Sequence, residues 1–233
     1  MIIAGPCSFI NMKDTGPISE TATLLDGVVD YFRCKVWLGG TSPDRYKTGI
    51  GKNGLHFLTN LGLPFMTEVQ VPKHIEYCKQ YDVDAIWIGA RNSQNYALLE
   101  ACSEFSGSVF IKRNPGMTIK EIIGIYDIMD VIFEKKPYII ERGINTIDRN
   151  DVSRWSISLN SILEIKYNRP DIFKKLVVDC SHSAGTHYYV QDIYNATKAM
   201  GVQHFMFECT SDGFSETDFN HIINVKDLKA IIS

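Results

Sequence analysis

The chain has 233 residues, of which 45% are hydrophobic and 22% charged, and this is ordinary for one large globular domain. A formal net charge of −3, without a basic patch interleaved with aromatic residues, excludes the usual signature of nucleic-acid binding. No apolar run reaches the roughly 18 residues of a membrane span, and the start MIIAGPCSF lacks the basic segment of a signal peptide. Six scattered cysteines without a CxxC pair predict reduced thiols and a cytoplasmic location.

Short apolar runs suited to strands alternate along the chain with segments of helical spacing. Segments 18–32 and 118–132 each carry one amphipathic face, and Thr118 is the expected N-cap of the second. Segments 189–200 and 216–232 repeat the pattern. The predicted strands are Met1–Ala4, Lys35–Leu38, Pro64–Thr67, Ala85–Ile88, Val109–Ile111, Tyr138–Ile140, Leu176–Val178 and His204–Phe207.

This alternation predicts a parallel sheet covered by helices. Eight strand–helix units fill the 233 residues without a linker, so we expect an α/β fold, a single (β/α)8 TIM barrel over residues 1–233. A doubly wound open sheet is the alternative. It is disfavoured because the turn after the first strand, AGPCSFIN, is not the GxGxxG loop of that fold.

Functional residues of such barrels lie just beyond the C-terminal ends of the strands. Cationic side chains follow several of the predicted strands in this sequence. Guanidinium groups bind phosphate or carboxylate through two hydrogen bonds, and lysine adds a point charge, so the ligand should carry about two or more negative charges. The cationic candidates are Arg91, Lys112 and Arg142, with Arg33 as a fourth.

A second group at the strand ends offers metal ligands. Cys7, His182 and Glu208 supply sulfur, nitrogen and oxygen donors, and Asp212 follows closely in TSDG. A buried cysteine usually only packs, and a single histidine is usually only hydrogen-bonded. All four together favour a divalent ion such as Mn, Fe, Co or Zn.

Sequence motifs along the whole chain carry a family resemblance. They are IAGPCS (3–8), TSP (41–43), TEV (67–69), IGARNSQNYALL (88–99), IKRNPGMTIKE (111–121), ERGINT (141–146), VDCSHSAG (178–185), FMFE (205–208) and SDG (211–213). With these motifs the chain resembles the class I 3-deoxy-D-arabino-heptulosonate 7-phosphate (DAHP) synthases. That family shares a superfamily with the 3-deoxy-octulosonate 8-phosphate (KDO8P) synthases, and IGARN with ERGI favours the compact DAHP subtype.

The resemblance implies a transferase that adds C3 of phosphoenolpyruvate (PEP) to the aldehyde of a sugar phosphate, with erythrose 4-phosphate first among acceptors, and releases phosphate. It also implies a divalent metal cofactor and a homo-oligomer, a tetramer or dimer. By resemblance, the PEP-binding residues are Arg33, Arg91, Lys112, Arg142 and His182; the metal ligands are Cys7, His182, Glu208 and Asp212; and His182 and Glu68 are catalytic.

The loop after the second predicted strand departs from the family. Relatives have Lys-Pro-Arg-Thr-Ser-Pro, whereas this chain has Leu-Gly-Gly-Thr-Ser-Pro at 38–43. Thr41 and Ser42 remain as candidates for binding the aldose. Lys35, Arg45 or Lys47 would have to replace the missing lysine, and Lys47 in YKTGIG is taken as the catalytic candidate.

Two alternatives to the standard reaction follow from this departure. The same PEP and metal half-site could serve a different aldehyde, or the barrel could bind these ligands without turnover. The segment after Glu208 is also shorter than in relatives, which makes Asp218 a rival to Asp212 as the fourth metal ligand.

Overall fold

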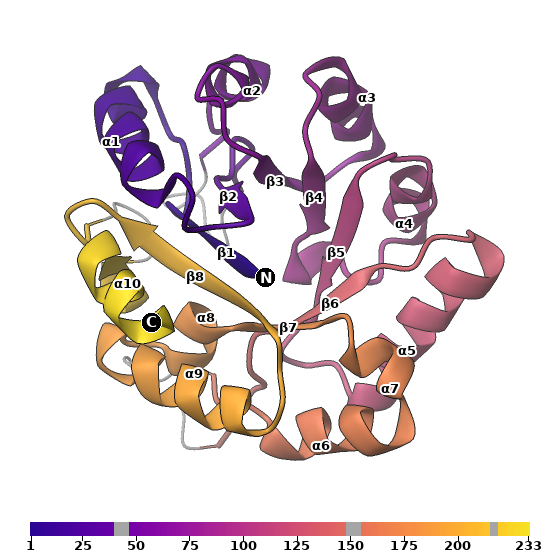
Figure 1. The fold of residues 1–233 in the computed structure, drawn as a ribbon. Coiled ribbons are helices and arrows are strands. Elements are labelled where there is room, and N and C mark those ends of the chain that lie inside the picture. The colour runs from indigo at the N-terminus through magenta and orange to yellow at the C-terminus, as the bar shows by residue number, and fades with distance from the viewer. Residues whose placement is uncertain (40–46, 148–154, 215–218) are drawn as a thin grey trace.

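The chain forms a closed parallel barrel surrounded by helices, which confirms the predicted (β/α)8 architecture (Figure 1). The structure is a computed structural model, and it describes residues 1–39, 47–147, 155–214 and 219–233. Within these ranges, no helix has both the length and the apolar character needed to span a membrane.

The barrel closes where β1 pairs with β8, with Ile2 opposite Phe205 and Gly5 opposite Glu208. All strand pairings are parallel, and each strand from β1 to β8 pairs with the next in the chain. The C-terminal strand ends therefore meet at one mouth of the barrel. The strands are β1 (Ile2–Gly5), β2 (Tyr31–Arg33), β3 (Phe65–Val69), β4 (Ala85–Ile88), β5 (Ser108–Lys112), β6 (Tyr138–Glu141), β7 (Leu176–Asp179), β8 (His204–Thr210) and the short β9 (Ile223–Asn224), which pairs with β8.

Helices pack around the outside of the barrel and bury the outward faces of the strands (Figure 1). The N-cap predicted at Thr118 is confirmed: its side chain accepts a hydrogen bond from the backbone N–H of Glu121, whose carboxylate bonds back. The helices are α1 (Thr15–Leu25), α2 (Lys52–Thr59), α3 (Pro72–Gln80), α4 (Tyr96–Ser103), α5 (Ile119–Asp127), α6 (Leu159–Asn168), α7 (Pro170–Phe173), α8 (Cys180–Ala184), α9 (Val190–Ala199) and α10 (Val225–Ile232), with short turns η1 (Met12–Asp14), η3 (Ala90–Asn92), η4 (Ile128–Ile132), η5 (His187–Tyr189) and η6 (Phe219–His221).

Three predicted elements are wrong in their bounds. The second strand is Tyr31–Arg33 rather than Lys35–Leu38, and α1 ends at Leu25 rather than continuing to residue 32. Gly27 has a φ of +68°, a backbone conformation that stops a helix, so Val28 and Val29 lie beyond α1 and Phe32 belongs to β2. The last helix likewise begins at Val225, where Asn224 caps it, and not at residue 216.

The barrel interior follows a strict alternation along the strands. Apolar residues such as Phe110, Val177 and Met206 form the inner core, while their neighbours in sequence face the helices. The next inward position after several of these residues is charged. The inward pairs are Tyr31 and Arg33, Met66 and Glu68, Phe110 and Lys112, Ile140 and Arg142, Val177 and Asp179, and Met206 and Glu208. An apolar core therefore ends in a charged layer at the C-terminal mouth.

Candidate active site

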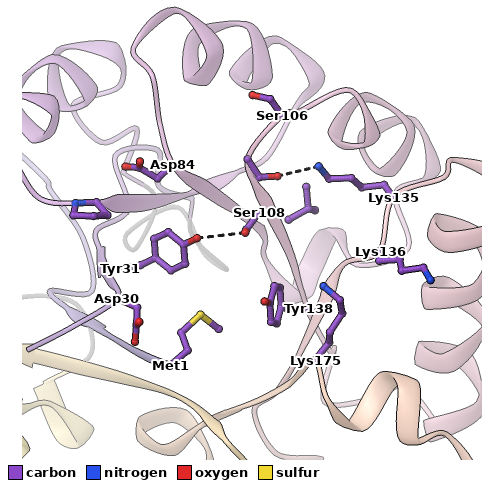
Figure 2. A pocket seen from close by; sticks show the side chains of 13 residues that line it. Met1, Asp30, Tyr31, Asp84, Ser106, Ser108, Lys135, Lys136, Tyr138 and Lys175 are labelled. Carbon is purple, nitrogen blue, oxygen red and sulfur yellow. Dashed lines mark hydrogen bonds between the residues drawn. The ribbon is translucent and has the colours of Figure 1, made fainter.

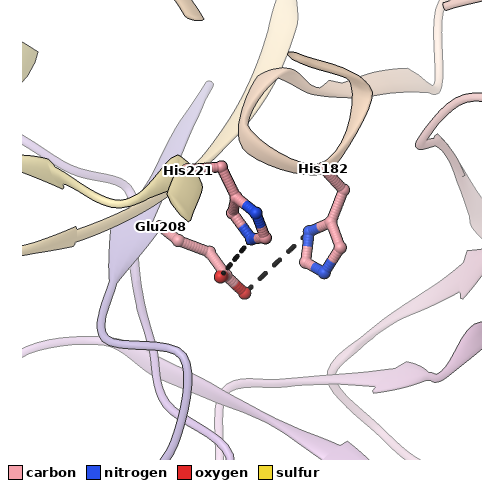
Figure 3. A group of neighbouring side chains, drawn as sticks. All are labelled: His182, Glu208 and His221. Carbon is pink, nitrogen blue, oxygen red and sulfur yellow. Dashed lines mark hydrogen bonds and ion pairs between the residues drawn. The ribbon is translucent and has the colours of Figure 1, made fainter. Parts of the chain in front are cut away.

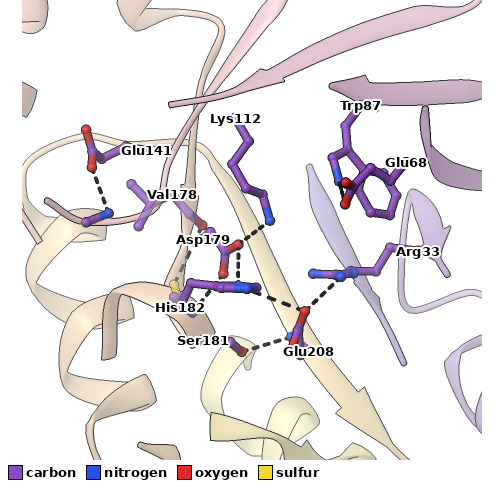
Figure 4. Close-up of polar contacts among 12 residues, drawn as sticks. Arg33, Glu68, Trp87, Lys112, Glu141, Val178, Asp179, Ser181, His182 and Glu208 are labelled. Carbon is purple, nitrogen blue, oxygen red and sulfur yellow. Dashed lines mark hydrogen bonds and ion pairs between the residues drawn. The ribbon is translucent and has the colours of Figure 1, made fainter. Parts of the chain in front are cut away.

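Two buried ion pairs lie in the charged layer, and each joins two strands that have one strand between them (Figure 4). Arg33 Nη2 lies 2.8 Å from Glu208 Oε1, and Lys112 Nζ lies 2.8 Å from Asp179 Oδ2. All four side chains are buried, so these charges interact in a medium that screens them weakly. The alternation of the strands thus brings together residues that are up to 175 positions apart in the chain, as for Arg33 at 33 and Glu208 at 208.

The turn from β7 into α8 places His182 beside these pairs. Asp179 ends β7 and caps α8, since its Oδ1 accepts a hydrogen bond of 3.0 Å from the backbone N–H of His182. His182 Nδ1 lies 2.9 Å from Asp179 Oδ2 and 3.9 Å from Glu208 Oε1. Asp179 therefore contacts both Lys112 and His182, and the VDCSHSAG segment delivers its polar end to the mouth of the barrel.

His182, Glu208 and His221 form a group suited to a metal ion (Figure 3). One ligand atom from each lies within 4.8 Å of the others. The Nε2 atom of His221 is 3.0 Å from Oε2 of Glu208. Figure 3 shows the imidazole rings of both histidines turned toward the carboxylate, and this is the one such group within the described ranges.

The protonation of His182 and Glu208 matches what a divalent ion requires. Burial lowers the pKa of His182 to about 4, against the opposing effect of the Asp179 and Glu208 carboxylates, so the imidazole is neutral near pH 7. Burial alone would raise the pKa of Glu208, but Arg33, His182 and His221 hold it well below its usual range. A neutral imidazole and a carboxylate are ligands that Mn, Fe, Co and Zn accept.

Unsatisfied buried atoms give a second indication that the group fits a metal. His182 Nδ1 and Glu208 Oε1 are buried and make no hydrogen bond of acceptable geometry, although both lie within ion-pair distance of charged neighbours. Buried polar atoms without a hydrogen bond are rare and costly. Coordination of an ion would satisfy these atoms, so the residues present fit the predicted cofactor.

The predicted cationic residues surround the same mouth at different depths. Burial, together with the Arg33 and Arg142 guanidinium groups, lowers the pKa of Lys112, while Asp179 opposes this shift. Arg142 is buried and stacks over the Trp155 ring at 3.8 Å. Arg91 lies in η3 and is exposed. Lys112, Arg33 and Arg142 therefore form the deep part of a cationic region, and Arg91 lies at its rim.

Arg33 also offers hydrogen-bond donors that the protein does not use. Its Nε and Nη1 atoms are buried and make no hydrogen bond. Its guanidinium lies 5.2 Å from the centre of the Trp87 ring, and burial would lower its pKa, but Glu208, Cys7 and Asp179 raise it above its ordinary value. A permanent cation with unused donors at this depth is suited to binding an anion.

Glu68 lies on the β3–β4 side of the mouth. Its carboxylate accepts a hydrogen bond of 3.2 Å from Trp87 Nε1. A Cβ atom at Gly89 would lie 2.3 Å from Glu68 Oε1, so the glycine leaves the space that this carboxylate occupies. Glu68 is thus held in place by its neighbours, in the position from which the sequence predicts a catalytic role.

The loop that departs from the family lies partly outside the described residues. Thr41, Ser42 and Arg45 of this loop lie outside the described residues. Asp218, which follows β8, also lies outside them, so the roles of all four stay predictions. Lys47 and Lys35 are both partly buried. Leu38, which stands where the family has lysine, is buried, with 7% of its surface exposed.

The structure places His221, and not the predicted Asp212, beside His182 and Glu208. Asp212 is exposed and bonds within its own turn, to Thr210 Oγ1 at 3.1 Å and to the backbone N–H of Phe214 at 3.0 Å. Cys7 is buried after β1 and close enough to Arg33 to raise its pKa, but it is not among the three clustered residues. His221 takes that place, and no strand-end position in the sequence singles it out.

Comparison with known proteins gives the family. Residues 1–226 match the DAHP synthetase I family. The chain belongs to this family. A phospho-2-dehydro-3-deoxyheptonate aldolase of Thermotoga maritima is 30% identical over 234 aligned positions, which cover 94% of this chain and 65% of that protein. The chain thus spans about two thirds of the length of this relative, and the family resemblance read from the motifs is confirmed.

Solved structures of DAHP synthase show the same fold in members of this family. The crystal structure of phospho-2-dehydro-3-deoxyheptonate aldolase (DAHP synthase) from Thermotoga maritima superposes with a TM-score of 0.84 at 26% identity, over 100% of this chain and 66% of that one. A truncated form of 3-deoxy-D-arabino-heptulosonate 7-phosphate synthase from Thermotoga maritima gives a TM-score of 0.81 at 24% identity, over 100% and 83% of the two chains. The whole of this chain therefore shares the barrel fold of these proteins.

Proposed function

We propose that this chain is a transferase of the DAHP synthase type. It condenses PEP with the aldehyde of a sugar phosphate, and erythrose 4-phosphate is the first acceptor to test. The carbon–carbon bond forms between C3 of PEP and the aldehyde carbon, water adds at C2, and inorganic phosphate leaves. One observation carries this proposal. Buried cationic residues and the His182–Glu208–His221 group lie at the same mouth of the barrel, and the ion pair of Arg33 and Glu208 joins them.

The cationic residues would bind and orient PEP. Lys112 and Arg142 are buried and placed to bind the carboxylate and phosphate, Arg33 offers two unused donors, and Arg91 closes the rim. Fixing the phosphate among cations stabilises the negative charge that develops as it departs. Glu68 and His182 lie at the same mouth, within reach of a ligand held there.

A divalent ion completes the proposed site. His182, Glu208 and His221 would hold it, as far as the described residues show. When bound, the ion would act as a Lewis acid toward the aldehyde oxygen of the acceptor. Asp179 would hold His182 beside the ion by accepting a hydrogen bond from its backbone N–H at the start of α8.

The acceptor side supports a second candidate function, in which the PEP half-site serves a different aldehyde. Leu38 is apolar and buried where the family has a lysine. A lost charged hydrogen bond is worth about 1.5–3 kcal/mol, so a phosphorylated aldose would bind more weakly unless another cation replaces it. Lys47 is the proposed replacement, with Thr41 and Ser42 as further aldose contacts.

The assay that tests the proposal measures inorganic phosphate released from PEP in the presence of Mn²⁺. Erythrose 4-phosphate, arabinose 5-phosphate and no acceptor form the three arms, and each is repeated with a chelator. Release that requires erythrose 4-phosphate supports the proposed reaction. Release that requires a different aldehyde supports the second candidate. PEP binding without release from any acceptor would show a binding protein and contradict both.

Lys112→Met should lower kcat/KM for PEP by roughly 10- to 150-fold, because it removes one charged hydrogen bond worth about 1.5–3 kcal/mol from the transition state. Lys120→Met, at an exposed position of α5, is the matched control. Initial rates of phosphate release over a range of PEP concentrations measure the change. Equal effects of the two substitutions would place PEP elsewhere.

Metal content separates the two possible ligand sets without relying on activity. We expect His221→Ala to lower the amount of Mn²⁺ retained after dialysis, and Asp212→Ala to leave it unchanged, because only His221 lies beside His182 and Glu208. Elemental analysis of the folded variants measures this. Loss of metal in Asp212→Ala, with His221→Ala unaffected, would restore the set predicted from sequence. The same measurement on Cys7→Ala tests the sulfur ligand of the set predicted from sequence.

We also propose that the chain forms a homo-oligomer, a tetramer or dimer, in the cytoplasm. The support is the family to which the chain belongs. Light scattering coupled to gel filtration measures the mass against the 26.4 kDa of one chain.

A further inference from the structure

A hollow lies at the N-terminal mouth of the barrel, at the opposite end of the strands from the proposed catalytic residues. Its volume is about 760 Å³. It is lined by residues that precede or begin the strands, including Tyr31 at the start of β2, Ser108 at the start of β5 and Tyr138 at the start of β6. Figure 2 shows the Tyr31 and Ser108 hydroxyls facing each other in it, 3.3 Å apart.

One wall of the hollow is cationic. Lys135 and Lys136 precede β6, and Lys175 immediately precedes β7, so three lysines come from two neighbouring loops (Figure 2). Among the described residues, no carboxylate forms an ion pair with Lys135 or Lys175, and Lys136 has only the half-buried Asp130 at 3.8 Å. The positive charge of this wall is thus nearly uncompensated by the protein.

The contacts that these lysines make within the protein do not neutralise their charge. Lys135 donates to the carbonyl oxygens of Phe105 and Gly107 at 2.6 and 2.9 Å. Lys175 lies over the Tyr138 ring, 4.2 Å from its centre. Burial, and then the repulsion of Lys136 and Lys135, lowers the pKa of Lys175. A bound anion would relieve this repulsion.

The opposite wall contains two acids, but each already has a structural partner. Asp30 accepts a hydrogen bond from the backbone N–H of Ile2 at 2.6 Å, and Asp84 accepts one from the backbone N–H of Phe65 at 2.9 Å. These bonds tie the loops before the strands to their neighbours. The hollow therefore has a cationic wall that faces solvent and an acidic wall engaged with the backbone.

We propose that the hollow is a binding site for a small anion, one that carries a phosphate group or paired carboxylates and is held by Lys135, Lys136 and Lys175. The Tyr138 ring, stacked on the buried Phe110 ring with centres 4.6 Å apart, lines the hollow beside the lysines and offers an apolar contact for the body of such a ligand. The site lies at the other end of the barrel from the PEP region and is independent of the proposed reaction.

The test measures the reactivity of individual lysines toward an amine-acylating reagent, with inorganic phosphate and malonate as the two probes and chloride at equal ionic strength as the reference. At free phosphate about tenfold above the dissociation constant, acylation of Lys175 and Lys136 should fall about tenfold. Lys226, exposed on α10 at a distance from the hollow, should not change. Protection by phosphate alone, or by malonate as well, distinguishes the two ligand chemistries.

A double variant, Lys136→Gln with Lys175→Gln, should lose one phosphate-binding site by calorimetry, whereas Lys226→Gln should keep it. Thermal unfolding checks that both variants are folded. Because neither lysine is near the PEP region, phosphate release from PEP should persist in the double variant. Uniform protection of all lysines, or an unchanged number of phosphate sites in the double variant, would overturn the proposal.

Discussion

Glu208→Ala should lower the free energy of unfolding by about 3–5 kcal/mol, because it leaves the Arg33 guanidinium buried without its partner at 2.8 Å. The same change removes the carboxylate that both histidines of the proposed metal group face. Denaturant unfolding measures the stability, and Glu164→Ala, at an exposed position of α6, is the matched control.

A double-mutant cycle identifies the cause of this loss. Arg33→Met combined with Glu208→Met removes both charges and leaves no buried ion uncompensated. We expect the double variant to be less destabilised than the sum of the two single variants, since buried ion pairs can be replaced by apolar residues at little cost. Additive losses would mean that Arg33 and Glu208 stabilise the barrel independently, and the ion pair would then not explain the effect.

Asp179→Asn is the second change with a large expected effect, again about 3–5 kcal/mol of unfolding free energy. Asparagine keeps an oxygen that can accept from the His182 backbone N–H, so the start of α8 is preserved. What is lost is the charge that faces Lys112 Nζ at 2.8 Å and His182 Nδ1 at 2.9 Å. The substitution therefore isolates the electrostatic role of Asp179.

The measurement combines denaturant unfolding with PEP binding by calorimetry at a temperature where the variant is folded. Asp192→Asn, exposed on α9, is the control. We expect weaker PEP binding as well as lower stability, because a lysine without its carboxylate partner loses both orientation and charge at this depth. Unchanged stability together with unchanged PEP affinity would show that Asp179 holds neither Lys112 nor His182.

Much of the barrel could be predicted because its strands are short apolar runs that end in charge. The strand Ala85–Ile88 is found as predicted, and β5 to β8 differ from prediction only at their ends. The error at β2 arose because Val28 and Phe32 also fit a helical spacing. The helix ends at Leu25, just before the left-handed Gly27, and a single glycine is a weak signal in sequence.

The residues of the candidate site could be predicted where they lie at strand ends. They could not be predicted where a loop brings them to the site. Lys112 and Asp179 end strands and Glu208 lies near the end of β8, so their meeting at one mouth follows from the parallel barrel alone. His221 reaches Glu208 from the loop after β8, 13 positions along the chain, and nothing local in NHIIN indicates that direction. Loop side chains depend on the path of the backbone, which residue spacing does not encode.

Along several strands the inward-facing side chains are apolar and then charged at the C-terminal end. This pattern limits which sequence changes the barrel tolerates. Insertion or deletion of one residue within β5 would turn Phe110 and Lys112 outward, toward the helices, and bring Val109 and Ile111 inside. A buried ammonium among apolar helices would then oppose folding. New specificities in such a protein can therefore arise by exchanging side chains at strand ends or by lengthening loops, whereas the length of each strand is fixed by the requirement that charge and chemistry stay on the same face.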